Sequence, residues 1–178
     1  MLFKGERLHL RFLEEPDACS LLAMTENEEI RYMTGTKARF TKEQIIRHME
    51  IWSEDPSRYD FAICLNETGE IIGDIALFEI NEEDRKAAFR IALHEIGLTG
   101  RGYGPEAMRI LMRFVFEELK LNRLQLEVYS HNVRGIKAYE KLGFVKEGIL
   151  RDSVIYNGQY SDEVIMSMLM RDYNRLKK

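Results

Sequence analysis

The chain has 178 residues, 45% of them hydrophobic and 31% charged, which is typical of one soluble globular domain. Its net charge of −4 at pH 7 argues against a nucleic-acid-binding surface, which needs a concentrated basic face, and favours a cationic partner. No apolar run is long enough to cross a bilayer, and the amino-terminal residues lack the apolar core of a signal peptide. We therefore expect one domain over residues 1–178, in the cytoplasm, that binds neither nucleic acid nor membrane.

The two cysteines, Cys19 and Cys64, lie in patterned apolar segments and lack the close spacing of metal ligands. We expect both to be buried free thiols in a reducing compartment, and we expect no metal site.

The amino-terminal third predicts a strand followed by two helices. A strand is expected at residues 6–12, where Leu8, Leu10 and Phe12 alternate with polar residues. Pro16 and Asp17 should open a helix whose inner side carries Cys19, Leu22 and Ala23. The acidic segment 25–29 should be exposed. Thr41 with Gln44 forms a capping-box pattern, so a second helix should run from there to about Trp52.

Three strands should then form an antiparallel meander. Residues 58–65 and 70–80 have strand character and are joined by the hairpin-type turn 66–69. A polar turn at 81–84 leads into a further strand that ends at Leu93.

A glycine-rich turn, Thr99-Gly100-Arg101-Gly102-Tyr103-Gly104, follows this meander. Glycines lack a Cβ, so the backbone N–H groups of such a turn can approach a ligand and point one way. Pro105 and Glu106 suit the start of a helix, and a helix start of this kind binds phosphate. Apolar residues at helical spacing predict a long buried helix, and alternation at 124–129 predicts a strand parallel to the one that ends at Leu93.

The carboxyl-terminal part predicts a short helix and a hairpin. The helix should stop at Leu142 with Gly143 as its cap, and residues 144–156 and 159–170 should pair around the turn Asn157-Gly158. Because the edge strands of this hairpin could pair between copies, we expect a homodimer.

The glycine turn also fits the dinucleotide fingerprint G-x-G-x-x-G/A, with Gly102, Gly104 and Ala107 at the fixed positions. A Rossmann domain is rejected because it needs repeated βα units around the fingerprint. Here a three-stranded meander precedes the turn and a hairpin follows it.

The segment from Asn132 to Phe144 reads NVRGIKAYEKLGF. Together with the glycine turn and the order of elements along the whole chain, it resembles the GNAT superfamily of N-acetyltransferases, which use acetyl-CoA. The resemblance implies an α/β (α+β) fold with a mixed, mostly antiparallel central sheet, a splayed pair of parallel strands and flanking helices. It also implies that residues 1–178 form a single acetyltransferase domain.

The resemblance assigns the coenzyme site residue by residue. The family's diphosphate loop falls on Thr99, Gly100, Arg101, Gly102, Tyr103 and Gly104, although Thr99 stands where the family has Gln or Arg. The pantetheine arm should run along Ile91, Ala92 and Leu93 as an added strand would. Asn132 matches the family's asparagine near the pantetheine, and Gly135 and Lys141 on the same helix are further candidates for coenzyme contact.

Tyr139 matches the family's tyrosine beside the thioester sulfur, and we expect it to act as the general acid. When a neutral amine attacks the thioester, an oxyanion forms and the thiol leaves more easily if a donor protonates it. A phenol is a donor at neutral pH. From spacing alone, Tyr139 reads as a core aromatic and Asn132 as a helix N-cap, and only the resemblance favours the functional reading.

The general base is not fixed by the sequence. His94, Glu95 and Glu127 each lie near the end of a strand beside the expected cleft, and a chain of water molecules is the alternative.

The closing hairpin resembles the branch that contains ribosomal-protein N-terminal acetyltransferases and spermidine acetyltransferases. Ala88 stands where the spermidine enzymes have an acid. An α-amine is already about 10–20% neutral at pH 7, whereas a lysine-like amine is almost wholly charged. A site without an evident base therefore favours a protein or peptide α-amine as acceptor. One alternative is a polyamine acceptor. The other is a regulatory module that binds acetyl-CoA without turnover, and Thr99 and the lack of an evident base favour this second alternative.

Overall fold

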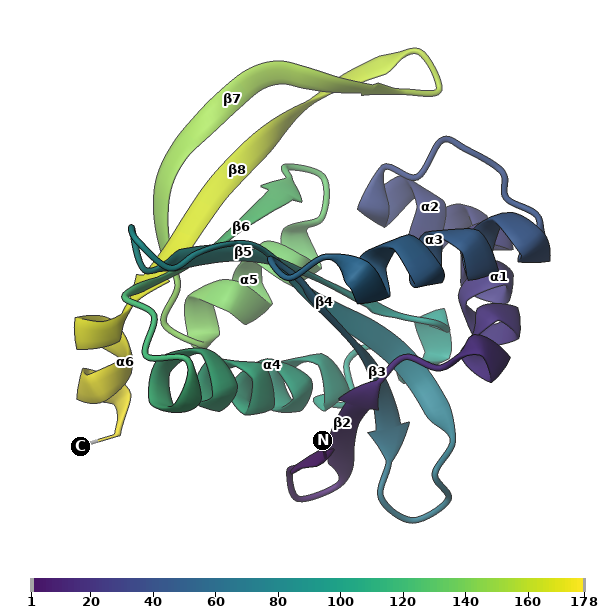
Figure 1. Ribbon diagram of the computed structural model, residues 1–178. Coiled ribbons are helices and arrows are strands. Elements are labelled where there is room, and N and C mark those ends of the chain that lie inside the picture. The colour runs from purple at the N-terminus through teal and green to yellow at the C-terminus, as the bar shows by residue number, and fades with distance from the viewer. Residues whose placement is uncertain (1, 178) are drawn as a thin grey trace.

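The fold is built on one mixed sheet of eight strands, as a computed structural model of the chain shows (Figure 1); residues 2–177 are described. The strand order is β1-β2-β3-β4-β5-β6-β8-β7, and every neighbouring pair is antiparallel except β5 with β6. The strands are β1 (Leu2–Lys4), β2 (Leu8–Phe12), β3 (Tyr59–Leu65), β4 (Ile71–Asn81), β5 (Lys86–Leu93), β6 (Arg123–Tyr129), β7 (Val145–Tyr156) and β8 (Gln159–Leu169). The predicted fold class is therefore confirmed.

Six α-helices flank the sheet in the described residues: α1 (Ala18–Glu26), α2 (Glu28–Thr34), α3 (Lys42–Glu54), α4 (Tyr103–Arg113), α5 (Val133–Lys141) and α6 (Met170–Leu176). Short 3-10 turns, η1 (Glu15–Asp17) and η2 (Ile96–Leu98), precede α1 and the glycine turn, and a π-helical turn, η3 (Phe114–Glu118), extends α4.

The parallel strands β5 and β6 separate soon after they meet. They pair only where Lys86, Ala87 and Ala88 face residues 123–125, while both strands continue beyond that point. On the side that faces β6, the remainder of β5 therefore has no strand partner. The predicted splayed pair is confirmed, and the backbone groups along this gap are free to bind an extended ligand as another strand would.

The main core lies between the sheet and α4. Alternate residues of β3 and β4, such as Phe61, Ile63, Ile75 and Leu77, are fully buried in one cluster with apolar residues of α4. The intervening residues of these strands point to the opposite sheet face. A smaller core of Ala18, Leu21, Ile45 and Met49 joins α1 to α3.

Several predicted turns and caps are confirmed in detail. The Thr41 side chain accepts from the Gln44 amide, and the Gln44 side chain accepts from the Thr41 amide in return. At the tip of the closing hairpin, Asn157 and Gly158 both have positive φ angles, 49° and 78°, as a type I′ turn requires.

Four local predictions were wrong. Thr25, in the segment expected to be exposed, is buried, and its hydroxyl donates to the Leu22 carbonyl. Cys19 is exposed and so is Ala23, because the buried face of α1 is formed instead by Ala18, Leu21 and Met24; only Cys64 is a buried thiol. The helix after the glycine turn starts at Tyr103, so Pro105 is its third residue and not its first. Proline is tolerated there because the first-turn amides of a helix have no intrahelical acceptor.

The sequence reasoning also missed β1, α2 and α6. Helix α2 begins at the cap Asn27, whose side chain accepts from the Ile30 amide, and ends at Gly35 with a φ angle of 67°. Glycine is required here, since a Cβ would lie 2.4 Å from the Tyr129 hydroxyl oxygen.

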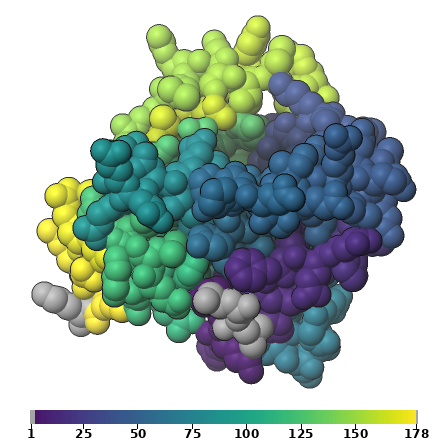
Figure 2. Space-filling model, in the orientation of Figure 1, coloured from purple at the N-terminus to yellow at the C-terminus, as the bar shows by residue number. Residues whose placement is uncertain are grey.

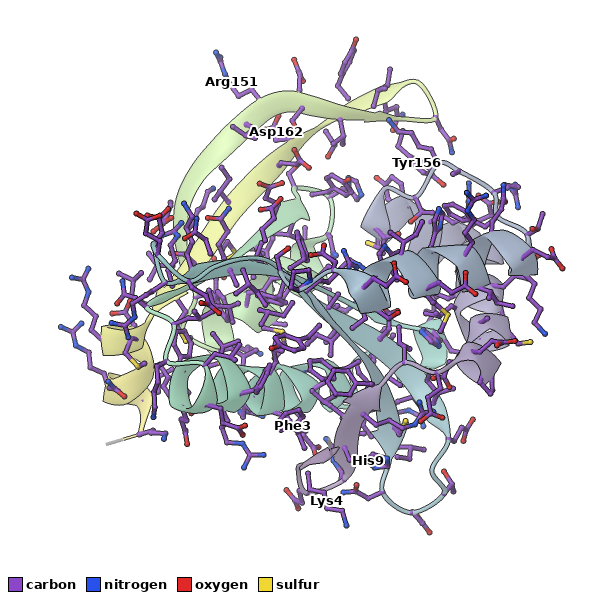
Figure 3. The ribbon with its side chains drawn as sticks, viewed as in Figure 1. Phe3, Lys4, His9, Arg151, Tyr156 and Asp162 are labelled. Atoms are coloured by element: carbon purple, nitrogen blue, oxygen red, sulfur yellow. The ribbon has the colours of Figure 1, made fainter. Side chains whose placement is uncertain are left out.

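The β7/β8 hairpin lies at one end of the sheet and forms the top of the molecule in Figure 2, and near its tip the Tyr156 ring packs on Tyr32 of α2. Its outer strand β7 exposes apolar side chains, and Arg151 points away from the body of the molecule (Figure 3). The homodimer expected through this hairpin stays a prediction.

Between residues 2 and 177, no helix has the length and apolar character needed to span a membrane.

The hairpin is tied to the sheet by Glu147, which accepts from Arg123 at 3.0 Å and from Ser167 at 2.7 Å. These hydrogen bonds, from Arg123 first, lower the Glu147 pKa to about 2 from an ordinary value of 4.5. The stabilisation is therefore complete above pH 4.5 and is lost as the pH falls toward 2. Because the Glu147 side chain is 38% exposed, we expect only about 1 kcal/mol.

We predict that Glu147→Gln lowers the free energy of unfolding by this amount at pH 7, and that the difference from wild type shrinks between pH 4.5 and 2. Urea unfolding at a series of pH values measures it. A difference that stays constant across this range would contradict the assigned pKa.

Candidate functional site

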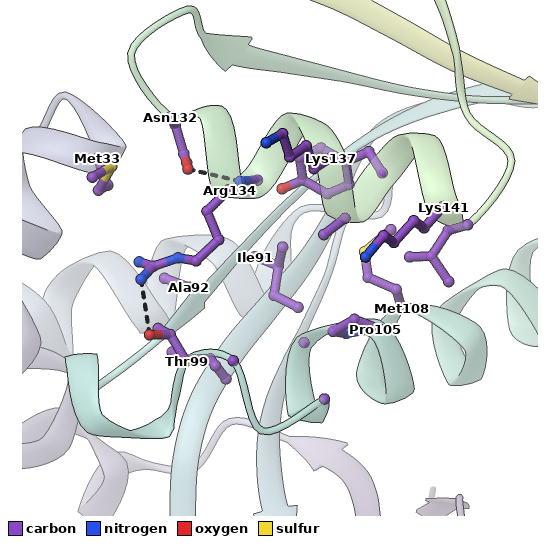
Figure 4. A pocket seen from close by; sticks show the side chains of 18 of the residues that line it. Met33, Ile91, Ala92, Thr99, Pro105, Met108, Asn132, Arg134, Lys137 and Lys141 are labelled. Carbon is purple, nitrogen blue, oxygen red and sulfur yellow. Dashed lines mark hydrogen bonds between the residues drawn. The ribbon is translucent and has the colours of Figure 1, made fainter.

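A pocket of about 700 Å³ lies between α4, α5 and the unpaired part of β5 (Figure 4). Ile91, Ala92 and Leu93 form one wall, and Pro105 and Met108 of α4 form part of another. The glycine turn closes one end through Gly100, Gly102 and Gly104. We call this cavity the loop pocket.

The glycine turn presents a row of free amides. Within the described residues, the backbone N–H groups of Gly100 to Gly104 donate to no other group of the chain; the first helical bond of α4 runs from Glu106 to the Gly102 carbonyl. Gly100 and Gly102 have φ angles of 78° and 85°, which favour glycine. Free amides at the start of a helix form an anion-binding site.

The charged residues that line the loop pocket are all cationic: Arg109, Arg134, Lys137 and Lys141. Arg134 reaches from the start of α5 across the pocket and donates to the Thr99 hydroxyl at 2.9 Å (Figure 4). Thr99 in turn donates to the Ile96 carbonyl at 2.6 Å. Although the whole chain is acidic, this pocket suits a polyanion.

A second pocket of about 610 Å³ is lined by residues of α1, α3, β4, β6 and β8, and we call it the acidic pocket. Three carboxylates line it, from Glu79, Glu127 and Glu163. Its Arg90 donates to Asp74 at 2.7 Å, so that cation already has a partner. The acidic pocket therefore suits a cation.

The three carboxylates act on one another. Partial burial raises the Glu127 pKa, and the charges of Glu163 and Glu79 raise it further. Glu79 lies in a bulge of β4 and has a φ angle of 53°, a conformation that costs a non-glycine residue free energy. Bulges beside functional sites re-aim side chains, which accounts for a carboxylate at this point of the pocket.

The two pockets meet at Tyr139. Six residues line both cavities: Met33, Thr34, Ile91, Ala92, Asn132 and Tyr139. The Tyr139 ring packs edge-on to Phe89 and Phe144, at 6.1 Å from each centroid, and its hydroxyl bonds to no other described residue. Burial raises the Tyr139 pKa to about 12, so the phenol is protonated at neutral pH.

Comparison with known proteins agrees with this architecture. Residues 7–145 match the model of the acetyltransferase (GNAT) domain. The chain is 30% identical to the probable N-acetyltransferase YjcK of Bacillus subtilis (strain 168), over 96% of this chain and 98% of that protein. The chain therefore belongs to the GNAT acetyltransferase family.

Two further relatives differ in their acceptors. The putative ribosomal N-acetyltransferase YdaF of Bacillus subtilis (strain 168) is 33% identical over 59% of this chain and 57% of its own length. A crystal structure of spermidine N-acetyltransferase from Vibrio cholerae with CoA and spermine matches with a TM-score of 0.89 and 25% identity, over 96% of this chain and 99% of that one. The present chain is accordingly an acetyl-CoA-dependent N-acetyltransferase that acts on an amine.

The structure brings together most of the residues that the resemblance assigned to the coenzyme. Ile91, Ala92, Leu93, Thr99, Gly100, Gly102, Gly104, Asn132, Gly135 and Lys141 all line the loop pocket. Arg101 and Tyr103 do not: the Arg101 carbonyl accepts from Arg7, and the Tyr103 ring lies under the Arg7 guanidinium. The backbone amides of these two residues remain unbonded within the described chain.

Asn132 also has the structural role that its position alone suggested. Its side chain caps α5 by accepting from the Gly135 amide at 2.9 Å. Gly135 is needed for this approach, since a Cβ would lie 2.9 Å from the Asn132 amide group.

Two of the three candidate bases are not in the site. His94 is buried and bonds to Asp74 at 3.2 Å and to Ser20 at 2.7 Å, and Glu95 is exposed at the start of η2. Neither residue lines either pocket, whereas Glu127 does. No group of His, Cys, Asp and Glu that could hold a metal ion occurs within the described part of the chain.

The sequence reasoning missed Arg134, Glu79 and Glu163. Arg134 lies inside the motif that carried the family resemblance. It is four residues before Ala138, which also lines the loop pocket, so both lie on the same face of α5. Glu79 depends on a bulge that the alternating pattern conceals. Glu163 reaches the site because β8 pairs with β6, a long-range contact that no local pattern encodes.

Proposed function

We propose that the enzyme transfers the acetyl group of acetyl-CoA to a primary amine of an aliphatic polyamine, of the spermidine or spermine type. One observation carries the proposal: a cationic pocket and an acidic pocket meet at Tyr139. The loop pocket would take the anionic coenzyme, and the acidic pocket would take a chain with several ammonium groups. A relative that binds CoA and spermine supports this choice.

In the proposed complex, the diphosphate of the coenzyme accepts from the amides of Gly100 to Gly104. Arg134, Lys137 and Lys141 add positive charge along the same pocket. Arg134 also compensates for Thr99, which stands where the family has Gln or Arg. The pantetheine arm lies along Ile91, Ala92 and Leu93, where β5 has no partner, and this places the thioester beside Tyr139.

Glu127 is the proposed general base. Its carboxylate lines the acidic pocket, and its pKa is raised toward the working pH by partial burial and by the neighbouring charges of Glu163 and Glu79. It would take a proton from the acceptor ammonium, and the neutral amine would then attack the thioester carbonyl. The oxyanion then collapses and the C–S bond breaks. The nitrogen passes its second proton to the departing thiolate, which releases the acetamide and CoA thiol.

Tyr139 would donate its hydroxyl proton, or share it in a hydrogen bond, to the departing sulfur. A thiol such as that of cysteine has a pKa near 8.5, well below the value of about 12 for Tyr139. Complete proton transfer is therefore uphill, and stabilisation of the thiolate by a hydrogen bond is the main contribution that we expect.

The second candidate acceptor is a protein or peptide α-amine. Ala88, which lines the acidic pocket in place of an acid, and the likeness to YdaF favour it. An α-amine would be preferred by a site without a base, whereas Glu127 lines the acidic pocket as a candidate base. Glu79, Glu127 and Glu163 also supply the negative charge that Ala88 does not.

The acceptor is tested by release of CoA thiol with spermidine, spermine and a library of peptides with free N-termini, each at equal concentration. We expect kcat/KM for the two polyamines to exceed that for any peptide by at least about tenfold, which corresponds to roughly 1.4 kcal/mol. A preference for peptides would overturn the polyamine assignment and leave the transferase assignment intact.

Glu127→Gln should lower kcat/KM at pH 7 by roughly 10²-fold because the base is lost. The acid limb of the pH–rate profile that belongs to Glu127 should vanish. Glu163→Gln is the matched control: it keeps the base but removes a charge that raises the Glu127 pKa, so the acid limb should move to lower pH. If both variants keep the wild-type profile, Glu127 is not the base.

Tyr139→Phe should lower kcat with little change in acetyl-CoA affinity, because the ring still packs on Phe89 and Phe144 and only the donor is removed. General acid catalysis contributes roughly 10²–10⁴-fold, and the high pKa places Tyr139 at the lower end. Steady-state kinetics with calorimetric titration of CoA separates the two effects. An unchanged kcat would remove Tyr139 from the mechanism.

A further inference from the structure

Arg7, in the tight turn between β1 and β2, is tied to the first turn of α4 although 99 residues separate it from Glu106 in the chain. One Glu106 oxygen accepts from the amides of Arg7, at 2.6 Å, and Leu8, at 3.1 Å. The other oxygen accepts from Arg7 Nε at 2.8 Å. Both oxygens of Glu106 are therefore engaged on the side of α4 that faces β2.

The same guanidinium reaches the glycine turn. Arg7 Nη1 donates to the Arg101 carbonyl at 3.0 Å, and the guanidinium lies 4.8 Å from the centroid of the Tyr103 ring. A trans peptide places its C=O and N–H on opposite sides. Because the Arg101 carbonyl points to Arg7, the Gly102 amide points away from Arg7, and Gly102 lines the loop pocket.

Gly102 lies close to the Arg7 guanidinium. Its φ angle of 85° belongs to the left-handed region, and a Cβ at this position would lie 3.2 Å from Arg7 Nη2. The guanidinium therefore occupies the back of the turn, opposite the amides that face the pocket.

The charge of Glu106 would otherwise oppose an anion at the start of α4. Although partial burial acts to raise the Glu106 pKa, the hydrogen bonds from Arg7 and Leu8 lower it, so the group is ionised at neutral pH. The Arg7 guanidinium and the two amides compensate that negative charge, and they hold it away from the five free amides of Gly100 to Gly104.

We propose that Arg7 and Glu106 are positioning residues for the diphosphate of acetyl-CoA: they fix the Arg101–Gly102 peptide so that its amide faces the ligand. The inference rests on the placement of the diphosphate at the glycine turn. Arg7 does not line the loop pocket, so its effect is exerted through the turn and not through direct contact with phosphate.

The test compares two acyl donors, acetyl-CoA and S-acetylpantetheine, of which only the first carries a diphosphate. For Arg7→Ala and Glu106→Gln we expect the KM for acetyl-CoA to rise about tenfold, with kcat changed less than twofold. The KM for S-acetylpantetheine should stay at the wild-type value. Arg7→Lys keeps the positive charge, but an ammonium group lacks the planar set of donors with which the guanidinium binds Glu106 and the Arg101 carbonyl at once. Its affinity for acetyl-CoA should therefore lie between those of Arg7→Ala and the wild type.

Arg113→Ala is the matched control. Arg113 also ties α4 to the amino-terminal strands, through the Lys4 carbonyl, but it lies at the far end of the helix from the glycine turn. This variant should leave both KM values unchanged. Thermal unfolding of each variant separates a local effect on the turn from a general loss of structure, and Glu106→Gln serves where Arg7→Ala does not fold.

Equal loss of affinity for both donors, or none for either, would overturn the proposal. If wild-type enzyme binds S-acetylpantetheine and acetyl-CoA with the same affinity, the diphosphate does not bind at the glycine turn. That result contradicts the proposed coenzyme site itself and is distinguishable from failure of the role of Arg7 and Glu106. Failure of the acceptor assignment would leave both donor measurements unaffected, since any amine that is acetylated suffices for them.

Discussion

The separation of β5 from β6 is the constraint on which the site depends. The two strands pair where β5 carries the small residues Ala87 and Ala88, and pairing stops where Phe89 begins a cluster with Tyr139 and Phe144. These aromatic rings pack together next to the point where pairing of β5 with β6 ends. An unpaired strand edge is costly when it is buried, about 1–3 kcal/mol for each unmet group. In the proposed complex, a coenzyme arm along this edge would satisfy these groups, and the same gap would let a donor and an acceptor approach one carbonyl from two pockets.

Charge is divided between these pockets in a way that the net value of −4 conceals. All four charged residues that line the loop pocket are cations, whereas Glu79, Glu127 and Glu163 gather in the acidic pocket. Partial burial and the like charges of Glu163 and Glu79 raise the Glu127 pKa, which is the usual means of bringing a carboxylate toward the range where it can accept a proton near neutral pH. A cationic acceptor would relieve that repulsion on binding. Electrostatics therefore favours binding of a polyamine.

The sequence predicts the parts of the site that short segments encode. The glycine turn, the Asn132 cap and Tyr139 all belong to contiguous motifs, so local backbone chemistry and the family resemblance were enough to assign them. The acidic pocket could not be predicted in the same way, because Glu79 requires a bulge and Glu163 requires the pairing of β8 with β6. Periodicity also failed for Cys19: on so short and weakly amphipathic a helix, the predicted inner face can be wrong by one position, which rotates it by about 100° and exposes Cys19.

Among the described residues that line the acidic pocket, Arg90 is the one arginine or lysine, and its charge argues against a cationic acceptor. Whether Arg90 repels a cation depends on Asp74, its ion-pair partner. Asp74 is only 1% exposed; burial acts to raise its pKa, but Arg90 and His94 lower it, so the carboxylate is ionised and holds Arg90 at 2.7 Å. His94 extends this network to Ser20, which joins α1 to the end of β5. Arg90 thus serves to fix the wall between the two pockets, and its charge is neutralised within the network instead of repelling an approaching ammonium group.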